Sequence, residues 1–255
     1  MAKDFGKRVV SQIKGIFRIP SYQRGYRWTS DEIVRLLDDI YEHRESSNSY
    51  YLQPIVVKNL SDDNTPKEER EYELIDGQQR LTTLFLIISS LKEELPKISP
   101  NYSLSYDTRD NSWDYLNSLF SDKEKAEQNK NNYIDYRYLH NAFITIQNWL
   151  AKQEDSTNVA YVLYNLLSSK VKVLWYEVDK DENGHELVKR LNIGRIPLTN
   201  AELIKALFLN RNSLESIRSS KNLSQHEIAL LWERMEQELR NPEFWAFLTN
   251  AKPEK

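Results

Sequence analysis

The stretch at residues 75–84 reads Ile-Asp-Gly-Gln-Gln-Arg-Leu-Thr-Thr-Leu and joins two expected elements. Residues 71–75 before it predict a strand, and from Gln78 onward apolar residues recur at helical spacing. Arg80 therefore lies in the opening turn of a helix, where the backbone N–H groups already present about half a positive charge. A cation is disfavoured there unless an anion lies nearby. The stretch thus indicates a phosphate site.

The same residues also have a purely structural interpretation. Asp76 is a natural N-cap, and Gln79, three residues later, would complete a capping box. Helix capping accounts for these two residues without any ligand, but it leaves Arg80 unexplained. On chemistry alone, phosphate binding and helix capping are equally supported.

A second informative stretch, residues 18–28, reads Arg-Ile-Pro-Ser-Tyr-Gln-Arg-Gly-Tyr-Arg-Trp. Its three arginines alternate with Tyr22, Tyr26 and Trp28, a pattern that suits stacking on a base and charge pairing to phosphate. The alternative is that the aromatic rings pack on the adjacent helix while the arginines face solvent, and taken alone this is favoured. It weakens because both stretches are expected at strand–helix junctions of one small α/β unit, and so near each other.

The composition bounds the possible functions. The chain has 255 residues, of which 40% are hydrophobic and 29% charged, as in an ordinary globular protein of one large or two smaller domains. It has no cysteine and only 4 histidines without paired ligand spacing, so thiolate chemistry is excluded and a histidine-built metal centre is not expected. Neither a signal peptide nor an apolar run of about 18 residues is found. We expect a cytoplasmic protein without a membrane partner.

The charge is unevenly distributed. The net charge of −3 argues against non-specific nucleic-acid binding by the whole surface. Residues 1–30, however, carry a strong excess of Lys and Arg over a single acid, Asp4. This basic segment keeps DNA binding open as an alternative function.

The remaining patterns predict an α+β fold. A capping box, Thr29-x-x-Glu32, begins a helix expected at 30–44, and a strand follows at 51–58, where Pro54 indicates an edge or a bulge. The other expected elements are helices at 112–120, 131–152 and 156–169 and a strand at 170–178. We therefore divide the chain into a small α/β core, residues 1–95, and a mostly helical region, residues 96–255, with one strand near 170–178.

Taken together, these stretches resemble the N-terminal domain of the GmrSD-type modification-dependent restriction family. The specific matches are Ile-Pro-x-Tyr-Gln-Arg-x-Tyr-x-Trp at 19–28, Tyr-x-Leu-x-x-Ile-Val at 50–56 and the stretch at 75–84. A weaker match is Leu-Asn-x-Gly-x-x-x-Leu-Thr-x-Ala-Glu-Leu-Ile-Lys at 191–205. The resemblance implies a ParB/sulfiredoxin-like core whose glycine-and-arginine turn holds the phosphates of a nucleotide. It also implies a role in defence against phage DNA, with a separate HNH-type nuclease domain or subunit doing the cutting.

The resemblance also names candidate site residues. Those expected in catalysis of nucleoside triphosphate hydrolysis are Asp76, Gln79, Arg80 and Arg24. Those expected to bind the nucleotide, together with Mg2+, are Tyr22, Gln23, Gly77, Gln78, Asn192 and Gly194. The metal ligands themselves are not identified. In isolation, the loop around Asn192 and Gly194 is better read as a turn with a helix cap.

Two functions follow from these observations. The favoured one is an NTP-binding and NTP-hydrolysing regulatory domain of a restriction system that senses modified DNA. The alternative is a non-catalytic module that binds DNA or docks a nuclease and whose nucleotide pocket is degenerate. A nuclease active in its own right is the least expected, because no metal-ligand constellation stands out.

Overall fold

A computed structural model of the chain describes residues 2–62, 64–108, 111–179, 225–239 and 244. The first strand, β1 (Ala2–Val9), leads through the 3-10 turn η1 (Val10–Gln12) to β2 (Gly15–Ile19). After a loop at 20–29 come α1 (Ser30–Glu42), η2 (His43–Glu45) and β3 (Tyr50–Asn59). Strand β4 (Glu71–Asp76) then runs into α2 (Gln78–Ser90) and η3 (Leu91–Glu93).

The second half of the described chain is mostly helical. It contains β5 (Tyr102–Tyr106), α3 (Ser112–Ser121), α4 (Lys123–Asn129), α5 (Ile134–Ala151), α6 (Ser156–Ser169), β6 (Val171–Val178) and α10 (Gln225–Leu239). The α+β fold class is confirmed. The segment expected as one helix at 131–152 forms as α5, and α4 precedes it as a separate short helix.

The strands form one mixed sheet in the order β1-β6-β3-β4-β2-β5. Strands β4, β2 and β5 are parallel neighbours, β3 is antiparallel to β4 and parallel to β6, and β1 is antiparallel to β6. Strands from both sides of residue 95 therefore belong to one sheet. The division into residues 1–95 and 96–255 stays a prediction.

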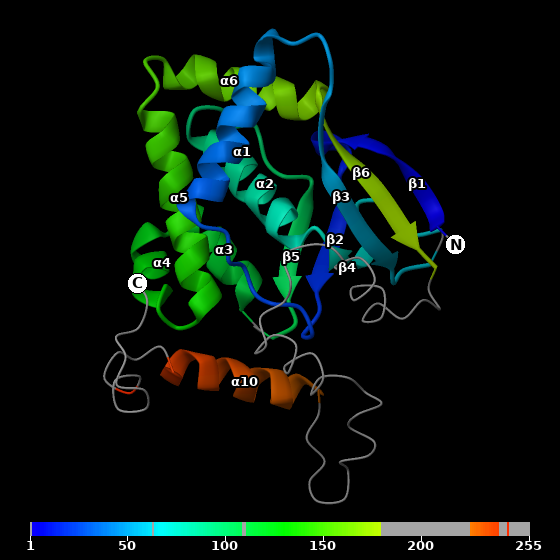
Figure 1. The fold of residues 1–255 in the computed structure, drawn as a ribbon, viewed down its shortest axis with the longest axis vertical. Helices are drawn as coiled ribbons and strands as arrows, with labels where there is room; N and C mark the ends of the chain where they lie inside the picture. The colour runs from blue at the N-terminus through cyan, green and yellow to red at the C-terminus, as the bar shows by residue number, and fades with distance from the viewer. Residues whose placement is uncertain (1, 63, 109–110, 180–224, 240–243, 245–255) are drawn as a thin grey trace, which may run out of the picture.

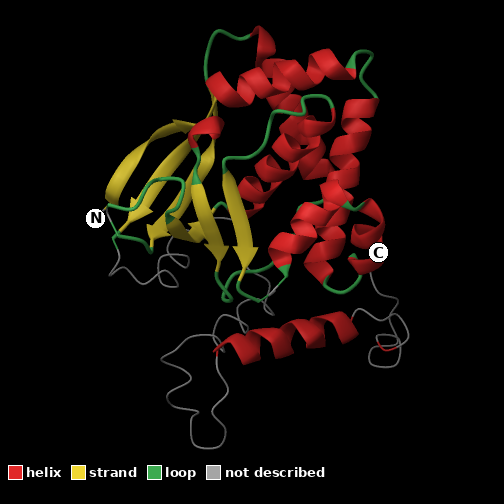
Figure 2. Ribbon diagram, turned by 180° about the vertical axis from the view of Figure 1, so that it is seen from behind, coloured by secondary structure: helices red, strands yellow, loops and turns green. Residues whose placement is uncertain are grey.

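Helices α1 to α6 gather on one side of the sheet, as both ribbon views show (Figures 1 and 2). Strand β2 illustrates the cause: Gly15, Phe17 and Ile19 are buried toward the helices, whereas Ile16 and Arg18 alternate with them and are exposed. A sheet with one covered and one open face gives this period-2 pattern. The open face thus carries its own set of side chains.

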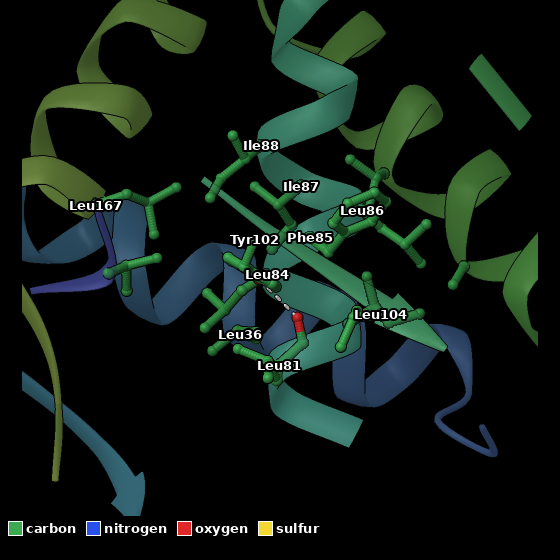
Figure 3. Packing of buried hydrophobic residues seen from close by; sticks show 14 of the residues in the cluster. Leu36, Leu81, Leu84, Phe85, Leu86, Ile87, Ile88, Tyr102, Leu104 and Leu167 are labelled. Carbon is green, nitrogen blue, oxygen red and sulfur yellow. Dashed lines mark hydrogen bonds between the residues drawn. The ribbon is translucent and has the colours of Figure 1, made fainter. Parts of the chain in front are cut away.

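Helix α2 is the centre of the core. It is buried at every position from Leu81 to Ser90, although the sequence predicted a single apolar stripe. Figure 3 shows Leu36 of α1, Tyr102 and Leu104 of β5 and Leu167 of α6 gathered around it. A helix covered on all sides must satisfy its polar side chains internally. The two threonines of α2 are satisfied in this way, as described below, whereas the buried Ser90 hydroxyl has no hydrogen-bond partner among the described residues.

Candidate functional site

Three parallel strands bring the two informative stretches to one edge of the sheet. The loop at 20–29 leaves the carboxyl end of β2, the Asp76-Gly77 turn leaves that of β4, and Asp107 follows that of β5. The N–H of Asp107 donates to the carbonyl of Ile19 over 2.9 Å, which ties two of these ends together. In open α/β sheets, ligands bind outside the carboxyl ends of the strands.

Gly77, not Asp76, is the N-cap of α2. Its φ of 97° lies in the left-handed region, which residues with a Cβ adopt only with strain. Glycine therefore suits this position. As a glycine, Gly77 has no side chain to cap the helix, and the first intrahelical bond runs from the N–H of Leu81 to the Gly77 carbonyl over 2.9 Å. The capping box expected between Asp76 and Gln79 is therefore wrong. The capping explanation of this stretch falls with it.

Gln79 binds the backbone of the loop at 20–29. Its side-chain oxygen accepts from the N–H groups of Arg27, at 2.8 Å, and Trp28, at 3.3 Å, and its side-chain nitrogen donates to the Gly25 carbonyl at 3.1 Å. All three partners are main-chain groups. Gln79 is thus placed to position this loop, while its expected role in catalysis stays a prediction.

Gln78 does the same one residue earlier. Its side-chain nitrogen donates to the Arg24 carbonyl over 2.7 Å, and only 7% of the residue is exposed. Its side-chain oxygen is buried without a hydrogen-bond partner in the protein. The two glutamines therefore hold successive carbonyl groups of the loop against the start of α2.

Tyr22 and Gln23 bind strand β4 from the other stretch. The Tyr22 hydroxyl donates to the carboxylate of Glu73, and the Gln23 side-chain nitrogen donates to the carbonyls of Leu74 and, over 2.9 Å, Ile75. Burial, followed by the neighbouring Glu73, raises the pKa of Tyr22 well above its ordinary value, so the hydroxyl remains a proton donor. These two residues anchor the loop to the sheet.

The buried Tyr26 completes the attachment. Its ring is fully buried and its hydroxyl lies 2.7 Å from Thr83 Oγ1, which also donates to the Gln79 carbonyl over 2.8 Å. Thr82 Oγ1 lies 3.1 Å from the Tyr106 hydroxyl of β5. The threonine pair of the 75–84 stretch therefore satisfies two tyrosine hydroxyls inside the core.

Arg80 is largely buried and binds acceptors of its own chain. Its Nη1 donates to Gln53 Oε1 over 2.7 Å and its Nη2 to the Pro54 carbonyl over 2.6 Å, while the Asp76 carboxylate lies 3.5 Å from Nη2. Its side chain is 12% exposed. The register of β3 against β6 shifts between Leu52 and Ile55, around the predicted bulge at Pro54. Direct phosphate binding by Arg80 stays a prediction.

The arginines of the 18–28 stretch are not equivalent. Arg24 has an exposed side chain beside the glutamine-bound loop backbone. Arg18 lies 3.4 Å from the Asp107 carboxylate, and the Arg27 guanidinium lies 5.4 Å from the centroid of the Tyr138 ring. Arg18 and Arg24 therefore both have exposed side chains at the joined edge, whereas Arg27 is half-buried.

The remaining site expectations have mixed outcomes. Asn192 and Gly194 lie outside the described residues. Among the described residues, no group of three or more His, Cys, Asp or Glu side chains could hold a metal ion. Mg2+ sites in nucleotide-binding proteins need only one or two carboxylate ligands beside the phosphates. Asp76, whose side chain is 20% exposed, has the chemistry of such a ligand at this edge.

Sequence reasoning missed two partners of the site. Asp135 of α5 is fully buried directly behind the loop, where a Cβ placed on Gly25 would lie 2.8 Å from the Asp135 Cβ. Gln53 and the Pro54 carbonyl supply acceptors for Arg80 from β3. The lone buried acid near the start of α5 was the available signal for the first. Pro54 indicated the bulge itself, but the sequence does not show that its carbonyl turns toward Arg80.

Comparison with known proteins adds one finding. A family model described as "GmrSD restriction endonuclease, N-terminal domain" matches residues 7–209, which confirms the resemblance seen in the sequence. The match includes the loop at 20–29 and the start of α2. No curated protein matches the chain. Among the described residues, no helix has the length and apolar character needed to cross a lipid bilayer.

Proposed function

Because this chain belongs to the family of the GmrSD restriction endonuclease N-terminal domain, and so is a component of a restriction system, we propose that it binds and hydrolyses a nucleoside triphosphate to regulate DNA cleavage. The cleavage itself would be carried out by an HNH-type nuclease domain or subunit acting on modified DNA. The nucleotide's phosphates would lie at the start of α2, beside the loop at 20–29.

One observation carries the proposal: the side chains of Gln78 and Gln79 bind the main chain of Arg24, Gly25, Arg27 and Trp28. The N-cap of α2 is Gly77, which has no side-chain acceptor of its own, and the first N–H groups of a helix favour an anion. The same contacts hold Arg24, an exposed cation, next to that helix end. The Arg24 guanidinium would then reach an anion bound by the N–H donors and the dipole of α2.

The roles of the residues follow from this arrangement. The first-turn N–H groups of α2 and the Arg24 guanidinium would bind phosphate oxygens, and the positive charge would stabilise the transition state. Arg80 would hold the Asp76-Gly77 turn against β3, and its positive charge would act on the phosphates without direct contact. Mg2+, held by Asp76 and the phosphates, would neutralise charge on the phosphate oxygens. Gln79 and Gln78 would act as positioning residues.

Binding of DNA through Arg18, Arg24 and Arg27 draws less support as an alternative. Arg18 is paired with Asp107, and Arg27 donates to the Tyr26 carbonyl over 3.2 Å while it lies against Tyr138. The Arg18 and Arg27 guanidinium groups therefore already have partners within the chain. A phosphate backbone would have to compete for them.

Nucleotide turnover by wild type, Arg24→Ala and Arg35→Ala tests the proposal. Arg35 is an exposed arginine of α1 and serves as the matched control. We expect turnover that requires magnesium, that falls at least tenfold in Arg24→Ala and that is unchanged in Arg35→Ala. Absence of turnover in the wild type, or equal rates in all three proteins, would contradict the proposal.

A further inference from the structure

The sheet face opposite the helices has a small buried cluster of Val56, Ile75 and Val178, and beside it aromatic and basic side chains over three adjacent strands. We call the outward positions of β1, β6 and β3 the outer face. The register places Phe5 opposite Tyr176, Lys7 opposite Leu174 and Lys172 opposite Tyr51, and Lys58 lies further along β3. The intervening residues, such as Trp175 and Leu52, point into the core.

These aromatic side chains are unusually exposed. Phe5 is 68% exposed and Tyr51 46% exposed. The Phe5 and Tyr176 rings meet edge to face, with their centroids 6.0 Å apart. Large apolar side chains that remain exposed on one face mark interaction surfaces more often than single scattered ones do.

The charge of the outer face is positive. Lys7 Nζ lies 4.9 Å from the centroid of the Tyr51 ring, and Lys172 neighbours the same residue. A hydrogen bond from Lys7 lowers the pKa of the Tyr51 hydroxyl below its ordinary value, and the positive charge of Lys172 lowers it further. Among the described side chains, none of the outward positions of these three strands is acidic, although the whole chain carries −3.

A flat sheet with exposed rings and interleaved ammonium groups is complementary to unpaired nucleotides. Rings offer stacking surfaces to bases of any identity, and lysines pair with the phosphates between them. Tyr176, which lies opposite Phe5, and Lys172, which lies opposite Tyr51, are four residues apart on β6, a distance of roughly 13 Å. Phe5 and Tyr51 are therefore spread along the strand direction. A duplex keeps its bases stacked on one another and leaves such rings unused.

We propose that the outer face binds single-stranded DNA, with bases stacked on Phe5 and Tyr51 and phosphates paired with Lys7 and Lys172. DNA is the nucleic acid that a restriction-system component encounters. A second copy of the chain is a poorer occupant, because a two-fold contact would bring lysine against lysine. This surface is separate from the site at the start of α2, and the proposal does not depend on nucleotide hydrolysis.

Fluorescence anisotropy of the full chain with a labelled single-stranded oligodeoxynucleotide tests this proposal. The variants are Phe5→Ala with Tyr51→Ala, and Lys7→Glu with Lys172→Glu. Matched controls are Tyr161→Ala, a 57% exposed tyrosine of α6, and Lys125→Glu on α4. Tyr51→Phe keeps the ring and removes only the hydroxyl. Circular dichroism melts of each variant separate loss of binding from loss of folding.

We expect the aromatic double variant to bind at least tenfold more weakly and Tyr51→Phe to bind like wild type. The lysine variant should bind more weakly and reduce the slope of log affinity against log salt by roughly 1.4, about 0.7 for each lost phosphate contact. Both control variants should leave the affinity unchanged, as should Arg24→Ala.

Three outcomes would overturn the proposal. These are tighter binding of a duplex or of the matching oligoribonucleotide, equal losses in the control variants, and folded outer-face variants that bind like wild type. A concentration-dependent dimer abolished by Phe5→Ala would instead assign the outer face to self-association. Because the readout contains no nucleoside triphosphate, failure here leaves the hydrolysis experiment unaffected.

Discussion

Gly25 shows how closely the loop at 20–29 is packed. A Cβ at this position would lie 2.8 Å from the Asp135 Cβ and 3.0 Å from its Cγ. Asp135 is fully buried and cannot move aside into solvent. Glycine is therefore required here for close approach between the loop and α5.

We predict that Gly25→Ala lowers the free energy of unfolding by about 1–3 kcal/mol, because overpacking forces the loop or α5 to shift. Denaturant unfolding measures the change. Gly6→Ala is the control, since a Cβ there meets nothing within 4 Å. Equal stability of the two variants would mean that the loop is not packed against α5.

Arg80 contributes to stability through a network inside the chain. Its guanidinium donates to Gln53 and to the Pro54 carbonyl and neighbours the Asp76 carboxylate. Hydrogen bonds from a charged donor in a largely buried place are stronger than exposed ion pairs.

Arg80→Ala should therefore destabilise the fold by about 2 kcal/mol, whereas Arg35→Ala, at an exposed position, should have almost no effect. Thermal and denaturant unfolding report both values. If Arg80→Ala unfolds like wild type and yet loses nucleotide binding, Arg80 acts on the ligand instead of on the fold.

Several residue roles were visible in the sequence and others were not. The cation in the first turn of α2 indicated a phosphate site, which stays a prediction. The structure shows an anion of the chain itself near it, Asp76, one helical turn before Arg80. The sequence did not identify the Pro54 carbonyl as an acceptor for Arg80, because the direction of that carbonyl depends on a β-bulge. Gln79 was assigned to the wrong local partner, since Gly77 adopts the left-handed conformation and becomes the cap.

At the scale of elements, the loop at 20–29 behaves as an attached part of α2. Gln79 alone makes three hydrogen bonds to its main chain. A loop held in this way should be ordered before any ligand arrives, which lowers the entropic cost of binding.

Gln79→Ala should release this loop. We expect hydrogen exchange at the Arg27 and Trp28 amides to become at least tenfold faster, while the core of α2 remains protected. Gln128→Ala, an exposed position on α4, is the control and should change neither. Unchanged protection at both amides would show that other contacts order the loop.

Elements with strong local signals were predicted well. Helices α1 and α6 and strands β3, β4 and β6 lie within one or two residues of the expected ranges, because capping residues and alternation mark them. Strands β1 and β5 were missed. Both lie at the edges of the sheet, where polar residues such as Lys7 and Ser105 occupy outward positions and the apolar signal is weak.

At the scale of the whole molecule, the sheet joins segments that are distant in the chain. Strand β6 lies between β1 and β3, and α5 packs against both α1 and α2. The sequence did not predict this pairing because register between distant strands depends on the assembled core and not on local pattern.

A protein ending at residue 95 would lack β5 and β6, and β1 would have no neighbouring strand. We therefore expect residues 1–95 alone to give a disordered circular dichroism spectrum without a cooperative melt, in contrast to the full chain. A cooperative transition of residues 1–95 would support the predicted division at residue 95 as an independent folding unit.

The most direct measurement is amide chemical-shift mapping of the full chain on addition of a non-hydrolysable nucleoside triphosphate with magnesium. If the phosphates bind at the start of α2, the largest changes should fall on Gly77, Gln78 and Gln79 and on Arg24 and Gly25 of the facing loop, and they should disappear in Arg24→Ala but persist in Arg35→Ala. Changes confined to other parts of the molecule, or no changes at saturating nucleotide, would contradict the proposed site.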